Sequence, residues 1–124
     1  MPKKFQLSEA GDRGWFVGSF EKAVHQTTTL EAGYQFNAKG EKSSPHYHKV
    51  ATEINLITRG AVKINGELYT SGMGVIFYPN EVAECEYLED TETMVIKTPG
   101  ALNDKYLVWI QQCSKPWRQR RSGQ

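Results

Sequence analysis

The chain has 124 residues, of which 39% are hydrophobic and 23% are charged, and its formal net charge is +1. A chain of this size can bury a core as one domain, and a charge near zero gives no field that would draw it to nucleic acid or to an anionic membrane. The polar N-terminus and the lack of an apolar run of roughly 18 residues predict neither a signal peptide nor a membrane span. We therefore expect a cytoplasmic protein whose partners, a small-molecule ligand among them, must be inferred from local sites.

Short β-type runs follow one another along the chain at intervals of roughly ten residues, which is typical of an all-β sandwich or barrel. The expected strands cover residues 15–20, 27–36, 53–58, 61–64, 67–70, 74–79, 83–89, 93–98 and 106–112. Asn65 and Gly66 separate the fourth run from the fifth. This pair predicts a tight hairpin, because a type I′ turn needs positive φ at both of its central residues.

A polar loop at residues 37–45 ends in Pro45, which favours an extended chain at the residue before it. The residues that follow are therefore expected to form a strand, on which His46 and His48 share one face and Tyr47 takes the other. Such a pair is often only a polar patch on a solvated strand. With the carboxylate of Glu53 close behind, however, the three side chains are suitable ligands for a divalent metal.

The two ends of the chain differ in character. Residues 1–113 are expected to form a single β-domain, whereas residues 114–124 carry four basic residues without apolar periodicity and are predicted to be a flexible tail. Basic tails of this kind are more often solvated than used for recognition, so binding to nucleic acid is not expected. Cys85 and Cys113 lie far apart without CxxC spacing, which predicts inert, partly buried thiols.

Flanking glycines make the histidine pattern more specific. The fixed positions are Gly40, then five residues, His46, one residue, His48, four residues, Glu53, six residues and Gly60. This spacing resembles the first signature motif of the cupin superfamily at every fixed position. The resemblance spans about residues 30–112 and implies an antiparallel jelly-roll barrel in which the two histidines and the glutamate bind one divalent metal, in agreement with the all-β pattern.

The same family usually takes a fourth ligand, a histidine, from a second motif, five residues after a proline. The run "GVIFYPNEVAECEYLEDT" resembles this motif through Gly74 and Pro79, but Glu84 occupies the histidine position. We expect Glu84 either to bind the metal or to stand away from it as a general acid or base, with its pKa shifted by the metal charge and by Glu86. The remaining interpretation is a solvated residue in an acidic run.

The expected ligands constrain the metal. A set of two histidines and two glutamates would cancel the formal charge of a divalent ion and make it a weaker Lewis acid than the usual set of three histidines and one glutamate. The motif offers no sulfur ligand that would favour Cu(I). We therefore expect one divalent transition metal, either Fe, Mn, Ni or Zn.

Strand parity predicts further residues of the site. If Glu53 faces inward, Asn55 shares its face and could hold a substrate oxygen. Tyr34 and Phe36, or else Gln35, lie on a strand that should cross near the metal, although aromatic residues in strands usually belong to the core. Lys97 and Lys105 could bind an anionic group, although exposed lysines usually serve only solubility.

Motifs of metalloproteases, serine hydrolases and P-loop proteins are missing. We expect a small metal-dependent enzyme acting on an oxygen-rich metabolite (a sugar, enediol or carboxylate) by isomerase, lyase or dioxygenase chemistry. The alternative is a non-catalytic module that binds a small metabolite or sugar. A homodimer is also expected, because exposed edge strands invite pairing and the run 15–20 is a candidate for exchange.

Overall fold

The computed structural model describes residues 1–101, 103–109 and 118–121, and only the backbone of Trp109 and Arg118–Arg121. The described part is an all-β jelly-roll with one short 3₁₀ helix, η1, and no α-helix. The elements in chain order are η1 (Leu7–Glu9), β1 (Trp15–Gly18), β2 (His25–Gln26), β3 (Glu31–Asn37), β4 (His46–His48), β5 (Thr52–Arg59), β6 (Ala61–Ile64), β7 (Glu67–Thr70), β8 (Gly74–Phe77), β9 (Cys85–Tyr87), β10 (Thr91–Thr98), β11 (Lys105–Trp109) and β12 (Arg118–Arg121).

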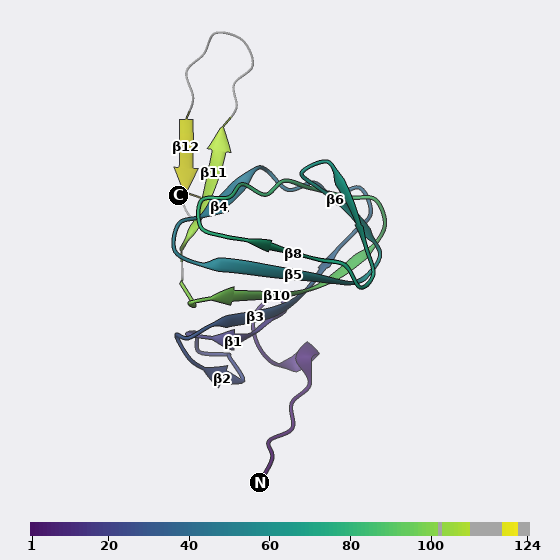
Figure 1. Ribbon diagram of the computed structural model, residues 1–124. Coiled ribbons are helices and arrows are strands. Elements are labelled where there is room, and N and C mark those ends of the chain that lie inside the picture. Colours follow the sequence, from purple (N-terminus) through teal and green to yellow (C-terminus); the bar gives the residue numbers. More distant parts are fainter. Residues whose placement is uncertain (102, 110–117, 122–124) are drawn as a thin grey trace.

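Three sheets make up the fold. A six-stranded sheet has the order β2-β1-β3-β10-β5-β8, and two three-stranded sheets have the orders β12-β11-β4 and β7-β6-β9. Figure 1 shows the strands of the large sheet stacked in one layer, with β4 and β6 on the other side of the molecule. Two backbone hydrogen bonds between His46 and Ala83, of 3.0 and 2.8 Å, join β4 to the loop before β9 and so connect the two small sheets.

The predicted hairpin is confirmed. Strands β6 and β7 have the predicted bounds and pair antiparallel, with Ile64 opposite Glu67. Between them Asn65 has φ 52° and Gly66 has φ 82°, which are the two positive values that a type I′ turn requires. Each of the other expected strands is present with at least one shifted end, whereas the short strand β2 and the strand β12 were not predicted.

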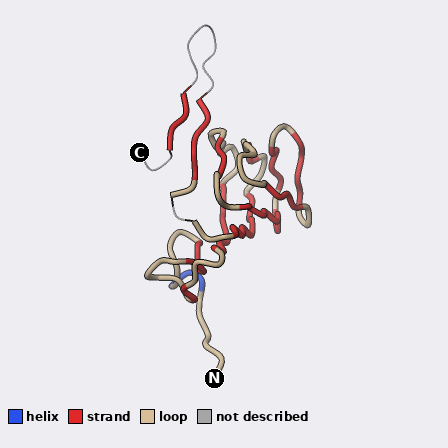
Figure 2. Tube along the Cα trace, turned by 60° about the vertical axis from the view of Figure 1, so that its left-hand side comes forward, coloured by secondary structure: helices blue, strands red, loops and turns tan. Residues whose placement is uncertain are grey.

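The predicted N-terminal strand is paired within the chain. Strand β1 lies between β3 and β2, so the outermost strands of the six-stranded sheet are β2 and β8. In the predicted tail, β12 pairs with β11 to form an arm that projects away from the large sheet, as both Figure 1 and Figure 2 show. The rest of the segment 114–124, like Cys113, lies outside the described residues.

Apolar side chains from both layers meet inside the jelly-roll. The buried cluster consists of Ile57, Val62, Ile64, Phe77 and Ala83. These residues also line the internal cavity, so the core forms part of the wall of the site.

Among the described residues, no helix has the length and apolar character that a membrane span would need.

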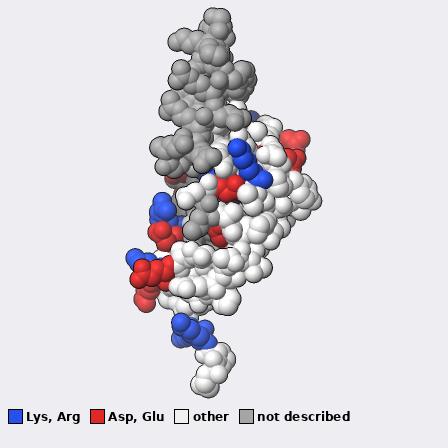
Figure 3. Space-filling view, turned by 90° about the vertical axis from the view of Figure 1, so that its left-hand side faces the viewer, with Lys and Arg blue, Asp and Glu red and all other residues white. Residues whose placement is uncertain are grey.

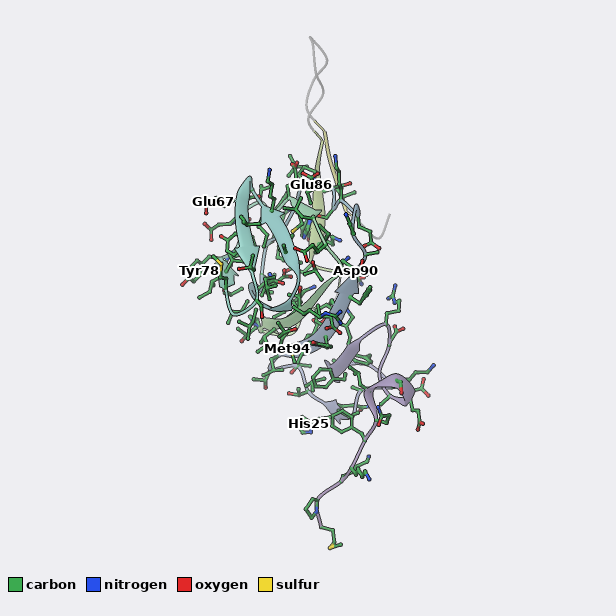
Figure 4. All side chains as sticks on the ribbon, turned by 90° about the vertical axis from the view of Figure 1, so that its right-hand side faces the viewer. His25, Glu67, Tyr78, Glu86, Asp90 and Met94 are labelled. Atoms are coloured by element: carbon green, nitrogen blue, oxygen red, sulfur yellow. The ribbon has the colours of Figure 1, made fainter. Side chains whose placement is uncertain are left out.

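The outer surface is mixed in character. Acidic and basic side chains lie close together on the face drawn in Figure 3, in keeping with the low net charge. Glu67, at the start of β7, and Tyr78, directly after β8, point away from the body of the molecule (Figure 4). Tyr78 is 59% exposed. His25 of β2 is exposed as well.

Candidate functional site

A cavity of about 550 Å³ lies inside the jelly-roll. The alternation of strand side chains turns His46 and His48 of β4 toward it from one layer, and Glu53 and Asn55 of β5 from the other. The three side chains of the first motif that were expected to meet therefore line one cavity. Their burial sets them in surroundings where charges and hydrogen bonds are stronger than in water.

His48 is held in place by Asp104, the residue that precedes β11. Its side chain is buried, and its Nδ1 lies 2.9 Å from the backbone carbonyl oxygen of Asp104. A carbonyl oxygen only accepts hydrogen bonds, so Nδ1 carries the donated proton. In the neutral ring the other nitrogen, Nε2, then bears a lone pair that faces the cavity.

The carboxylate of Asp104 organises the loop that follows His48. Its two oxygens accept hydrogen bonds from three consecutive backbone N–H groups, those of Lys49, Val50 and Ala51, at 2.9 to 3.2 Å. Without it these donors would lose their protein partners, and that of Ala51 would do so in a buried position. Asp104 therefore fixes the connection between β4 and β5, and through its carbonyl oxygen it fixes the ring of His48.

Glu53 is bound at both carboxylate oxygens. Its Oε1 lies 2.9 Å from Nε2 of His48, and its Oε2 accepts a hydrogen bond of 2.9 Å from Nδ2 of Asn55. Burial raises the pKa of Glu53, but the hydrogen bonds from His48 and Asn55, with a further contribution from the charge of Lys97, outweigh burial and lower it to about 2. Glu53 is therefore a carboxylate at neutral pH.

The short contact between His48 and Glu53 requires a positive charge at or beside the two side chains. With Nδ1 donating to Asp104, a neutral His48 ring would present a lone pair at Nε2, and an ionised carboxylate can only accept, so His48 can donate to Glu53 only when Nε2 is protonated as well. Two acceptor atoms 2.9 Å apart repel each other unless a cation lies between or beside them. That cation is either a proton on Nε2, which makes an ion pair, or a metal ion that both atoms bind.

His46 stands slightly apart from this pair. Its ring centroid is 6.0 Å from that of His48, with 78° between the ring planes, and its Nδ1 donates to the carbonyl oxygen of Ser44 at 2.9 Å. Burial lowers the pKa of His46, so its ring is neutral near pH 7 with a lone pair on Nε2. As placed, no three His, Cys, Asp or Glu side chains in the described residues form a group that could hold a metal ion.

Glu84 does not join the site, which corrects the prediction that it is a fourth ligand or a catalytic acid or base. It is exposed and does not line the cavity, whereas its neighbours Ala83 and Cys85 do. The register of β9 on β6 explains this, since Cys85 lies opposite the buried Ile64. Residues that lie opposite each other share a face, so a shift by one residue turns the side chain to the other side.

The same parity corrects the aromatic pair. Tyr34 and Phe36 point away from the cavity: the hydroxyl of Tyr34 lies 2.8 Å from Oγ1 of Thr58, and Phe36 is 58% exposed. They are neither substrate-binding residues nor core. The alternative residue, Gln35, lines the cavity together with Asn37. Asn55 lines it as well, and its amide nitrogen is used to hold Glu53.

Several cavity residues were not recognised as such from the sequence. Cys85 and Tyr87 of β9 face inward, and burial raises the pKa of both side chains, which keeps them neutral. The alternation of these residues with Glu84 and Glu86 was visible in the sequence, but it does not say which set faces in. Trp15 and Arg13, from the N-terminal segment, also line the cavity.

Comparison with solved structures places the fold among the cupin proteins. KdgF from Halomonas sp. matches with a TM-score of 0.56 and 22% identity over 61% of this chain and 74% of that chain. An uncharacterized conserved protein with a double-stranded β-helix domain from Klebsiella pneumoniae matches with a TM-score of 0.59 and 16% identity, over 79% of this chain and 85% of the other. A cupin-2 domain containing protein from Shewanella frigidimarina matches with 0.52 and 11%, over 60% and 76%.

These likenesses show the fold, and they agree with the all-β jelly-roll that the resemblance to the cupin motif implied. At 11 to 22% identity they show the fold alone. No family model matches the chain, and no curated protein matches it. What the chain can do therefore depends on the cavity and its side chains.

Proposed function

We propose that the protein is an enzyme that acts on a small, oxygen-rich metabolite, such as a sugar, an enediol or a carboxylate, bound in the cavity. The observation that supports this most is the contact of 2.9 Å between Nε2 of His48 and Oε1 of Glu53, which lie buried together in a cavity of about 550 Å³. A cavity of this size with a few convergent polar groups is the usual setting of a small-molecule site. The reaction type is an isomerisation, a lyase step or a dioxygenation.

The proposal includes one divalent metal, either Fe, Mn, Ni or Zn. The donor chemistry of His48 and Glu53 suits such an ion, and both sides of the pair are anchored, by Asp104 and by Asn55. His46 would be the third ligand, and for this its ring must come closer to His48 than the present 6.0 Å between centroids. When bound, the metal would supply Lewis acidity toward a substrate oxygen.

The side chains divide the remaining tasks. Glu53, with a pKa of about 2, is a weak base and serves as a fixed negative charge. The neutral His46 ring, whose Nδ1 donates to Ser44, keeps a lone pair on Nε2 that can take a proton from a substrate when it is not used as a ligand. This role replaces the one predicted for Glu84. Asn55 positions Glu53 and retains a carbonyl oxygen that can accept a hydrogen bond from a substrate hydroxyl.

A direct test follows turnover in D₂O by proton NMR. Purified protein, supplied in turn with Fe, Mn, Ni and Zn, is incubated with a set of sugars, sugar acids and hydroxy acids in air. Conversion of at least one compound is expected, and Glu53→Gln should lower kcat/KM for it by about 100-fold or more, because the charge beside His48 is lost. Glu84→Gln serves as the matched control and should leave kcat/KM unchanged.

Either of two results would contradict this proposal. Equal turnover in wild type and Glu53→Gln would place the chemistry elsewhere. Binding of a compound without any turnover would favour the alternative function, a non-catalytic module that binds a small metabolite or sugar. That alternative is supported by the finding that, within the described residues, no three potential ligands stand together.

We also propose that the protein forms a homodimer through a sheet edge. The edges of the six-stranded sheet are β2, of two residues, and β8, of four residues. Unpaired backbone groups at a sheet edge invite another strand, and β8 is the longer of the two edges. Because β1 is paired on both sides within the chain, β8 replaces it as the expected place of contact.

A further inference from the structure

Three basic side chains, from Lys and Arg residues, reach the cavity from three separate parts of the chain. They are Arg13, before β1, Lys97 of β10 and Lys105 of β11. Arg13 is paired with a neighbour, since its Nε lies 3.4 Å from Oδ1 of Asp12, and its side chain is 86% exposed. The two lysines, in contrast, have no carboxylate within ion-pair distance among the described residues.

Lys97 lies directly across the sheet from Glu53. The two residues are opposite each other in the pairing of β10 with β5, so both side chains project from the inner face. The Nζ of Lys97 lies 4.9 Å from the centroid of the Trp15 ring, which gives the ammonium group a cation–π contact at the cavity wall. This ring holds the lysine at the wall without neutralising its charge.

Lys105 occupies the equivalent position in the other layer. It lies opposite His48 in the pairing of β11 with β4, and it lines the cavity from that side while remaining exposed. Its charge also contributes to the lowered pKa of His46, although burial is the larger cause. The two lysines thus belong to opposite layers and border the same space as the histidines.

The described lining offers little negative charge to balance them. Glu53 is its one carboxylate, and both oxygens of that group are already bound, by His48 and by Asn55. Cys85 and Tyr87 remain neutral because burial raises the pKa of each. The two lysines therefore leave the cavity with an excess of positive charge, which favours an anionic occupant.

The uncharged polar part of the lining suits hydroxyl groups. Gln35, Asn37 and Asn55 contribute amide groups, and Ser43 and Thr93 contribute hydroxyls. Trp15 offers an aromatic wall beside Lys97. Amides and hydroxyls pair with the hydroxyl groups of a sugar, while an aromatic face packs against its carbon skeleton.

From this arrangement we infer that the cavity takes an anionic sugar derivative, whose acid group is held by Lys97 and Lys105 and whose hydroxyl groups face the amide side chains. The inference rests on the proposed function only in taking the same cavity as the ligand site. A carboxylate and a phosphate ester are both anions that two ammonium groups can hold, so the test includes both.

The test measures binding without turnover, by ligand-observed NMR on the full chain. The probes are glucose, glucuronate and glucose 6-phosphate, and galactose, galacturonate and galactose 6-phosphate. At least one acid is expected to bind more tightly than its neutral parent, by tenfold or more. Lys97→Met and Lys105→Met should each weaken that binding by about tenfold, since each removes one charged hydrogen bond.

Two further variants complete the design. Lys63→Met removes an exposed lysine that lies opposite Glu86 on the outer face and should leave binding unchanged. Lys97→Arg keeps the charge and should bind the acid with an affinity within about threefold of wild type. If only Lys97→Met loses binding, the loss is due to the missing charge and not to misfolding. The inference is wrong if no acid binds, if the neutral sugars bind as tightly as the acids, or if the two methionine variants bind as wild type does.

The outcome is separable from that of the proposed function. Acids that bind through the two lysines but are never converted would contradict the enzyme and leave the inference standing. Neutral sugars that bind equally well and are converted by a process dependent on Glu53 would contradict the inference and leave the enzyme standing. The sugar acids and sugar phosphates distinguish a carboxylate from a phosphate as the group that is held.

Discussion

Replacing Asp104 with alanine is expected to lower the free energy of unfolding by about 3 kcal/mol. The carboxylate is buried, and it accepts hydrogen bonds from the backbone N–H groups of Lys49, Val50 and Ala51. Alanine would remove the hydrogen bonds of all three donors, each worth about 1 kcal/mol. Urea unfolding followed by tryptophan fluorescence measures the change.

Two comparisons isolate this role of Asp104. Asp104→Asn keeps one carbonyl oxygen as an acceptor and should lose about half as much stability as the alanine variant. Asp90→Ala removes an exposed carboxylate that accepts a single hydrogen bond, from the N–H of Lys39 at 2.9 Å, and should cost less than about 1 kcal/mol. Equal losses for Asp104→Ala and Asp90→Ala would show that the loop does not depend on the buried carboxylate.

Gly60→Ala is expected to destabilise the fold by about 3 kcal/mol or more, or to prevent folding. Gly60 has φ +99°, and a Cβ there would lie 2.4 Å from the carbonyl oxygen of Asp90 and 2.7 Å from Oγ1 of Thr91. Both the backbone conformation and the lack of space therefore exclude a side chain. Thermal unfolding by circular dichroism is the measurement.

Gly40→Ala is the natural control, because it changes the other glycine of the same motif. Gly40 has φ +92°, but nothing lies within 4 Å of the position a Cβ would take. Only the backbone strain remains, at a cost of about 1 to 2 kcal/mol. If the two alanine variants unfold at the same temperature, crowding at Gly60 is not what requires a glycine.

Local patterns predicted the parts of this protein that depend on neighbouring residues. The hairpin at Asn65-Gly66 follows from the φ values that those two residues tolerate. The inward side of β4 and β5 follows from strand alternation together with the spacing of His46, His48 and Glu53. In each case the signal lies within a few residues of the structure it specifies.

Predictions that depended on the facing of a strand succeeded less well. For Glu84, counting from Pro79 identified a position, but the loop between β8 and β9 decides which side chain faces inward, and that side chain is Cys85. For Tyr34 and Phe36, either parity was compatible with the sequence. A slip of one residue exchanges inner and outer faces, and alternating polar and apolar residues do not always reveal it.

Long-range pairing was outside what the sequence can specify. Asp104 lies 56 residues from His48, yet its carbonyl oxygen holds that ring and its carboxylate holds the adjoining loop. Lys97 and Lys105 were recognised as possible anion ligands, but only the pairing of β10 with β5 and of β11 with β4 brings them to the same cavity as Glu53 and His48. Such contacts depend on the topology of the whole jelly-roll.

Metal analysis of the protein purified without added metal, by mass spectrometry, tests most directly whether His46, His48 and Glu53 share a cation. The wild type and Glu84→Gln are predicted to hold about one equivalent of a divalent transition metal, and His48→Ala less than about a tenth of that. The same small fraction of metal in all three proteins would contradict the account, and would leave His48 and Glu53 as a protonated ion pair.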